Sequence, residues 1–75
     1  MIGQELHYLV VLPERKTVLN RVRVAPNELD VESLERRNAK RQAHAERLAS
    51  RWSDTLYKSD KIEVKPIGIY QEYRW

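Results

Sequence analysis

The 75-residue sequence contains no cysteine and no phenylalanine, and it has only two glycines, two histidines and three prolines. Without cysteine it can form neither a disulfide framework nor a thiolate metal site, and two histidines are too few for a histidine-rich metal site. The apolar run near the N-terminus spans only about five to seven residues, too short for a signal peptide or a membrane span. We therefore expect a soluble, cytoplasmic protein that has no membrane partner and carries neither a metal nor another cofactor.

The sequence also lacks the motifs on which catalysis usually rests. Gly3 and Gly68 stand alone, so there is no glycine-rich loop to hold a phosphate group. Neither His7 nor His44 has a serine, cysteine or aspartate at a recognisable motif spacing, and the carboxylates are scattered. The sequence also lacks the signatures of the common nucleic-acid-binding folds: it has no GXXG loop, no RNP-type aromatic pattern and no second helix for a helix-turn-helix. We expect no enzymatic activity and no small-molecule substrate.

Two segments in the first third of the chain have the pattern of strands, within a single domain that spans residues 1–75. Residues 5–12, "ELHYLVVL", are apolar on both faces and stop at Pro13, which favours a central strand. Residues 17–24, "TVLNRVRV", alternate and predict a strand with one face in water. In that strand Val18, Val22 and Val24 are expected on one side, and Arg21 and Arg23 on the other.

Residues 31–56 contain no glycine or proline and are rich in helix formers, so they predict one long helix. Asp30 or Asn27 is the expected N-cap. At about 100° per residue the apolar positions fall on one face, and they are Val31, Leu34, Ala45, Leu48, Ala49, Trp52 and Leu56. That face is interrupted in its middle by Asn38, Arg41 and Gln42, so the second half of the helix should face the core.

Residues 62–73, "IEVKPIGIYQEY", alternate again, and Pro66 and Gly68 suggest a bulged edge strand. The predicted element order is therefore β-β-α-β. The compact solution is a three-stranded antiparallel or mixed sheet of order 2-1-3, with the first strand in the centre and one long helix packed on one face. The sequence thus predicts an α+β fold.

The expected helix separates its charges by face. One ridge has residues at steps of three and four, namely Arg36, Lys40, His44, Arg47 and Arg51, flanked by Arg37 and Arg41. The glutamates fall on a neighbouring flank. We refer to these seven residues as the basic ridge, and predict that it binds an acidic protein surface or nucleic acid. The alternative is a solvated face whose arginine stems cover apolar surface.

One helix covers only one face of a three-stranded sheet, yet the first strand is apolar on both. A homodimer or a docked partner should then cover the second face, because monomers rarely expose large apolar patches. The tail "YQEYRW" carries residue types enriched at interface hot spots, and its candidate binding residues are Tyr70, Tyr73, Arg74 and Trp75. The alternative is that the tail itself packs against the sheet.

In size, in its net charge of +3 and in element order, the chain looks like the small proteins that phages use to inhibit host RNA polymerase or CRISPR complexes. The resemblance rests on the order of "ELHYLVVL", "TVLNRVRV", the helix and "IEVKPIGIY", and on no specific residues. It implies a non-enzymatic inhibitor or modulator of a nucleic-acid-handling complex. The alternatives are direct DNA or RNA binding and a structural subunit that assembles with itself.

Overall fold

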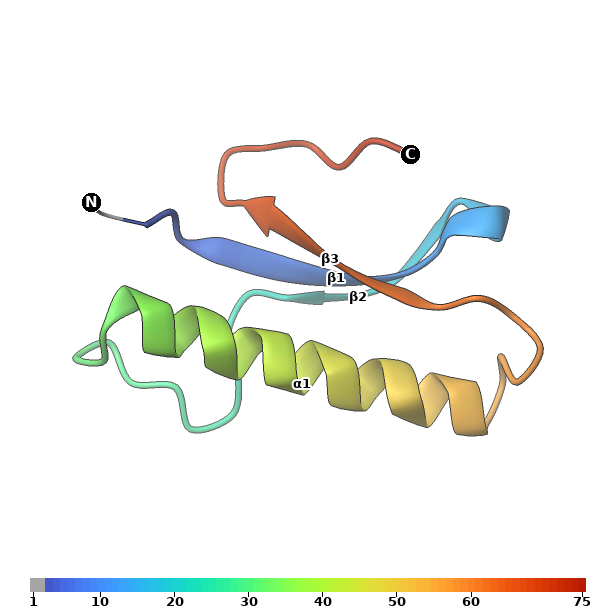
Figure 1. Cartoon of the computed structure of the whole chain (residues 1–75), viewed down its shortest axis with the longest axis horizontal. Helices are drawn as coiled ribbons and strands as arrows, with labels where there is room; N and C mark the ends of the chain where they lie inside the picture. The colour runs from blue at the N-terminus through green and yellow to red at the C-terminus, as the bar shows by residue number, and fades with distance from the viewer. Residues whose placement is uncertain (1–2) are drawn as a thin grey trace.

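The computed structural model describes residues 3–75 as a three-stranded sheet with one long helix against it (Figure 1). The elements in chain order are β1 (Leu6–Leu12), the short 3-10 helix η1 (Pro13–Arg15), β2 (Thr17–Val22), α1 (Leu34–Asp54) and β3 (Glu63–Gly68). The strand order is β2-β1-β3, and both pairings are antiparallel. The predicted α+β fold, its β-β-α-β order and the central position of the first strand are confirmed.

Strand β1 is buried on both faces, as its sequence indicates. Tyr8 and Val10 point toward α1, whereas Leu9 and Val11 point to the opposite side of the sheet. Leu9, Val10 and Val11 are all fully buried. Because successive side chains of a strand alternate between faces, this one strand contributes to two separate apolar layers.

Strand β2 departs from the simple alternation expected for residues 17–24. Its register with β1 shifts between Val10 and Val11, so that Val10 pairs with Asn20 whereas Val11 pairs with Val18. Such a bulge adds one residue and reverses the facing of the side chains beyond it. The prediction that Val18 and Val22 share a face is therefore wrong: Val18 lies opposite Val11 and Val22 opposite Tyr8.

Strand β3 is an edge strand, as predicted, but it carries no bulge. Its pairing with β1 runs without a break from Val11–Glu63 to Leu6–Gly68. Pro66 fits within it because an edge strand has a row of backbone groups that need no partner strand. The strand also ends at Gly68, earlier than the sequence suggested.

Helix α1 begins three residues later than expected. Its N-cap is Ser33, whose side-chain oxygen accepts a hydrogen bond of 3.2 Å from the Arg36 amide. The prediction of Asp30 or Asn27 as N-cap is wrong, and Val31 lies before the helix, 90% exposed. Leu56, beyond the helix end, is 74% exposed. Both residues that were expected at the ends of the apolar face thus lie outside the helix.

The second half of α1 packs on the sheet, as predicted. Ala45 is fully buried against Tyr8, Val10 and Val22, and its small side chain lets the helix approach the sheet closely. Leu48, Ala49 and Trp52 extend this layer. The indole Nε1 of Trp52 donates a hydrogen bond of 2.6 Å to Asn20 Oδ1 on β2, so its polar atom is satisfied at the edge of the core.

The second face of the sheet is covered by the C-terminal tail of the same chain. After β3 the chain turns back and runs along the side of the sheet that faces away from α1 (Figure 1). Tyr73 packs there against Leu9, Val11 and Ile67. The expectation of an uncovered face is wrong. The alternative of a packed tail is confirmed for Tyr73, whereas Tyr70 and Trp75 remain exposed.

Replacing Tyr73 with alanine should lower the free energy of unfolding by about 1 to 3 kcal/mol, because it uncovers the layer formed by Leu9 and Val11. Tyr70 is the control, since it is 93% exposed and its replacement should change stability by less than about 0.5 kcal/mol. Urea unfolding of both variants provides the measurement. Equal stability of the two would mean that the tail does not protect this face.

Candidate binding surface

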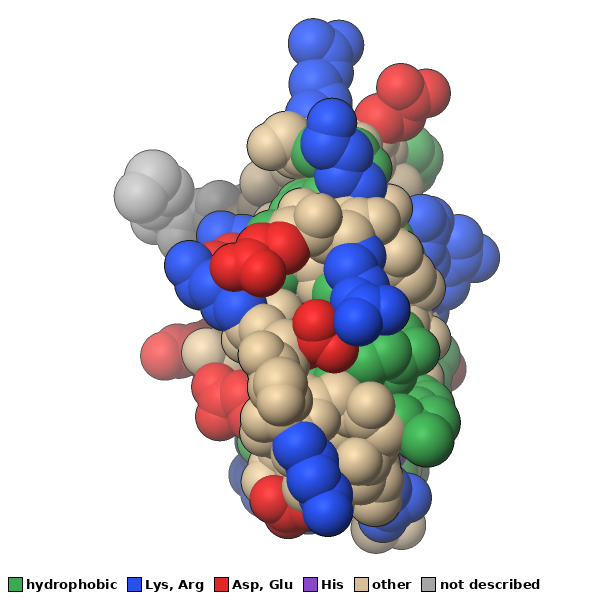
Figure 2. Space-filling model, turned by 90° about the vertical axis from the view of Figure 1, so that its right-hand side faces the viewer, with side chains coloured by type: hydrophobic (Ala, Val, Ile, Leu, Met, Phe, Trp, Pro, Cys, Tyr) green, Lys and Arg blue, Asp and Glu red, His purple; other side chains and the backbone are tan. Residues whose placement is uncertain are grey.

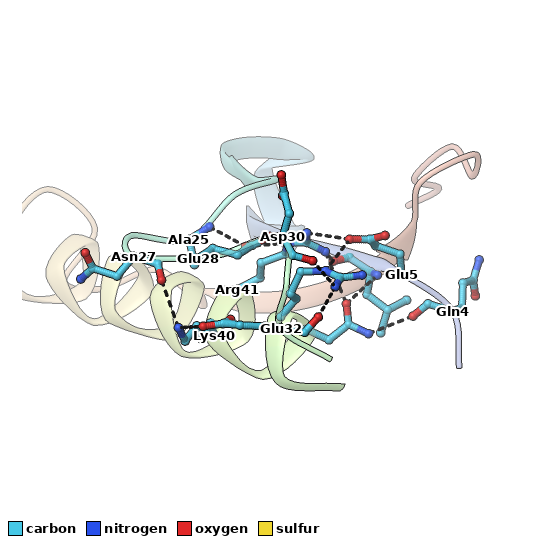
Figure 3. A network of polar contacts seen from close by, with 12 residues as sticks. Gln4, Glu5, Ala25, Asn27, Glu28, Asp30, Glu32, Lys40 and Arg41 are labelled. Atoms are coloured by element: carbon cyan, nitrogen blue, oxygen red, sulfur yellow. Dashed lines mark hydrogen bonds and ion pairs between the residues drawn. The ribbon is translucent and has the colours of Figure 1, made fainter. Parts of the chain in front are cut away.

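Arg41 does not belong to an outward-facing surface. It lies where the helix meets the start of β1, and only 5% of it is exposed (Figure 3). Its Nε donates to Glu28 Oε2 at 3.0 Å, and its two terminal nitrogens reach Glu5 Oε1 at 2.7 Å and the Leu6 carbonyl at 3.2 Å. The prediction of Arg41 as a partner-binding residue is wrong, because a planar guanidinium with five donors can be buried when carboxylates surround it.

Glu28 completes this buried ion pair from the loop between β2 and α1. Its side chain is 5% exposed, and Oε2 also accepts a 3.0 Å hydrogen bond from the Ala25 amide. Burial alone would raise the pKa of Glu28, but the hydrogen bonds from Arg41 and Ala25 hold this pKa below its ordinary value. The hydrogen bond from Arg41 is also the main cause of the lowered pKa of Glu5. Both carboxylates are therefore charged at neutral pH.

Two more cations of the basic ridge hold the same loop. Arg37 donates to Glu5 Oε1 at 3.3 Å and to the backbone carbonyls of Asp30 and Glu32. Lys40 donates to the Asn27 carbonyl at 3.1 Å and forms an ion pair with the Glu32 carboxylate. Both side chains are partly buried, so the expectation that Lys40 is freely exposed is wrong. These cations therefore contribute to the fold, and their charges are not free for a partner.

Asn38, which the sequence showed only as an interruption of the apolar face, also joins the helix to β1. Its Oδ1 accepts from the Leu6 amide and its Nδ2 donates to the Gln4 carbonyl, both at 2.9 Å. The amide side chain thus pairs with the backbone at the start of β1, where strand hydrogen bonds end. Two of the three interruptions of the apolar face, Asn38 and Arg41, thus join the helix to β1, whereas Gln42 donates a hydrogen bond to Glu46 on the same helix.

Three arginines of the basic ridge remain exposed. Arg36, Arg47 and Arg51 make no side-chain hydrogen bond or ion pair with any residue in the range 3–75. Arg36 and Arg47 are three helical turns apart, about 16 Å along the same line of α1, and Arg51 follows one turn later. We call these three residues the helix arginine row. His44 is half-buried beside it.

The cations at the end of the molecule that carries η1 differ from this row. Arg15 pairs with Asp60 at 3.1 Å, and Glu63 pairs with both Lys61 and Lys65, at 3.1 and 2.7 Å. Figure 2 looks at this end, and there basic and acidic side chains lie next to one another. This end therefore presents mixed charge rather than a field of one sign.

The second face of the sheet carries the other unpaired arginines. Arg21 lies opposite Leu9, and Arg23 follows two residues later; both are exposed and have no side-chain partner among residues 3–75. Burial, followed by the positive charges of Arg41 and Arg23, lowers the pKa of His7 on the same face. Of the four tail candidates, Tyr73 is in the core, whereas Tyr70, Arg74 and Trp75 are exposed.

No family model, curated protein or solved structure matches this chain. Within residues 3–75 no three histidine, aspartate or glutamate side chains are placed to hold a metal ion. In the same range no helix is both long and apolar enough to cross a membrane. The candidate surface is therefore defined by the geometry of its own residues.

Replacing Arg41 with alanine should lower the free energy of unfolding by about 3 to 5 kcal/mol, because Glu28 would remain buried without its partner. The free energy of unfolding of a chain of this size is only about 4 to 11 kcal/mol in total. Arg36 to alanine, with the same loss of charge from the same helix, should cost less than about 0.5 kcal/mol. Thermal and urea unfolding compare the two variants, and equal costs would contradict the structural role of Arg41.

The lowered pKa values of Glu5 and Glu28 also predict a loss of stability in acid. Each carboxylate contributes stability that is fully present above the ordinary pKa of 4.5 and is lost as the pH falls through the lower value of the folded state. Side-chain carboxyl titration by NMR should therefore give midpoints below 4.5 for both residues. Midpoints at or above 4.5 would show that Arg41 does not lower the pKa values of these carboxylates.

Proposed function

We propose that this chain is a small non-enzymatic binding protein that docks through the helix arginine row onto an acidic surface of another protein. The observation that carries the proposal is the division of the six lysines and arginines of α1 into two sets. Arg37, Lys40 and Arg41 are paired within the fold, whereas Arg36, Arg47 and Arg51 are exposed and unpaired. The positive charge of the helix is thus directed outward at three positions.

The row is left unpaired although partners of opposite charge are near. Glu35, Glu46 and Asp54 are exposed on the same helix and form no ion pair with the row. Arg47 and Arg51 lie four residues apart, a spacing at which like charges destabilise a helix by a few tenths of a kcal/mol. An acidic partner removes that repulsion, and guanidinium groups match carboxylates through paired hydrogen bonds. The arrangement therefore suits binding better than stability.

A protein partner fits this face better than a nucleic-acid duplex does. Asp54 falls on the same helical line as Arg36 and Arg47, and Glu35 and Glu46 lie on the neighbouring flank. A duplex presents phosphates at every step and would bring some of them against these carboxylates. A protein surface can place single cations opposite the helix carboxylates and acidic groups opposite the helix arginines.

The partner class we propose is a component of a nucleic-acid-handling complex, because such complexes contain acidic sites that compete with or regulate nucleic acid. In that setting a small basic protein would act as an inhibitor or modulator. Self-assembly through the second sheet face has less support than the sequence suggested, since Tyr73 already covers Leu9 and Val11.

Reversing two charges of the row, with Arg36→Glu and Arg47→Glu together, should weaken partner binding at least about tenfold while the fold is retained. Both side chains are exposed, so the thermal midpoint should change little. The measurement is affinity capture from host-cell lysate, with and without nuclease, followed by mass spectrometry and by titration of the purified partner.

The control is Lys16→Glu together with Lys58→Glu, which changes the net charge equally at two exposed positions off the helix. It should bind as the wild type does. If the helix variant also binds normally, the row is only a solvated face and the proposal fails. A partner that disappears after nuclease treatment would instead indicate that nucleic acid makes the contact.

A further inference from the structure

The second face of the sheet combines unpaired arginines with aromatic rings. Leu9 lies at its centre, with Arg21 as its neighbour on β2 and Lys65 as its neighbour on β3. Tyr73 of the tail packs over Leu9, and the ring of Trp75 meets the ring of Tyr73 edge to face, with centroids 4.9 Å apart. The side of the sheet away from α1 thus carries both cationic and aromatic side chains.

We propose that this face binds single-stranded nucleic acid, with phosphates held by Arg21 and Arg23 and a base stacked on Trp75. Proteins that bind single strands without strong sequence preference combine a positive track for the backbone with aromatic platforms for the bases. This site goes beyond the proposed docking function of α1, and it uses a different set of residues on the opposite side of the molecule.

The charge of this face supports an anionic ligand. Arg21 lies on β2 and Arg23 follows one residue beyond its end, so an extended chain separates them by at most about 7 Å. That separation lets two guanidinium groups contact neighbouring phosphates of an extended strand. The charges of both act on His7, which places both near this face. Neither arginine has an acidic partner within residues 3–75, whereas Lys65 is already paired with Glu63. The two arginines therefore retain their full charge for a ligand.

The aromatic part of this face is exposed but held in place. Trp75 is 53% exposed even though Tyr73, on which it rests, is anchored in the core layer. A large ring that is fixed on one side and open on the other offers a stacking surface at low entropic cost. Tyr70, 93% exposed on the turn between β3 and the tail, is a second exposed ring.

A duplex fits this face less well than a single strand does. Arg21 lies on an edge strand, Arg23 lies just beyond it, and the rings lie on an irregular tail, so on this face no helix or two-stranded ribbon projects that could enter a groove. Unpaired bases, in contrast, can reach Trp75 directly. The ligand class is therefore single-stranded DNA or RNA.

The test is fluorescence anisotropy of a labelled oligo-dT, and of the matching oligo-U, of about twelve nucleotides, titrated with the full chain. We expect binding that weakens steeply between about 50 and 200 mM salt. The double variant Arg21→Gln and Arg23→Gln should lower the affinity at least about tenfold and flatten the salt dependence. Trp75→Ala should lower the affinity by roughly fivefold or more, with a salt dependence like that of the wild type.

The matched control is Arg47→Gln with Arg51→Gln, which removes the same charge from the helix arginine row. It should leave oligonucleotide binding within about twofold of the wild type, and circular dichroism should show all variants folded. The proposal is overturned if the wild type does not bind the oligonucleotides, or if the helix control weakens binding as much as the β2 variant. It also fails if polyglutamate competes as well as oligo-dT, because charge alone would then explain the binding.

Discussion

A guanidinium group buried in the middle of a helix dictates much of this structure. Arg41 lies among the core-facing positions of α1, and taking its charge out of water is costly unless carboxylates and carbonyls surround it. Glu28 reaches it from the loop after β2, and Glu5 reaches it from the residues before β1. The loop must therefore fold back along the first turns of the helix, where Arg37 and Lys40 bind it as well. The late start of α1 at Leu34, after the N-cap Ser33, fits this course of the loop.

The second constraint is that β1 is apolar on both faces in a chain too short for two layers of helices. The helix covers one face, and the C-terminal tail covers the other through Tyr73. A tail of this kind shields only the centre of a sheet face, so the outer strand β2 keeps Arg21 and Arg23 in water. Trp75 remains half exposed, because it rests on the ring of Tyr73 rather than on the sheet itself.

The sequence predicted those parts of the fold that depend on the pattern within one element. The central position of β1 follows from its two apolar faces, and the packing of Ala45, Leu48 and Trp52 follows from helical spacing. Apart from the N-cap, a local error, the main errors concern contacts between distant segments. The bulge in β2 depends on its pairing with β1, and the burial of Arg41 depends on Glu28, thirteen residues away. One signal was present in the sequence, since Arg41 and Asn38 fall within the apolar face, where a charged or amide side chain needs a partner.

Ion pairing within the fold also explains why the candidate surface is smaller than the basic ridge. Six of the 14 lysine and arginine side chains form ion pairs within the fold, and three of these belong to the first half of α1. Apart from Arg74 in the tail, the arginines without an ion pair among residues 3–75 fall into two groups, one on the outer side of α1 and the other on β2 and just beyond its end. The two groups lie on opposite sides of the molecule, with the sheet and the helix between them. If both proposals hold, a partner on one face leaves the other face accessible, and the two binding functions can be tested separately in one chain.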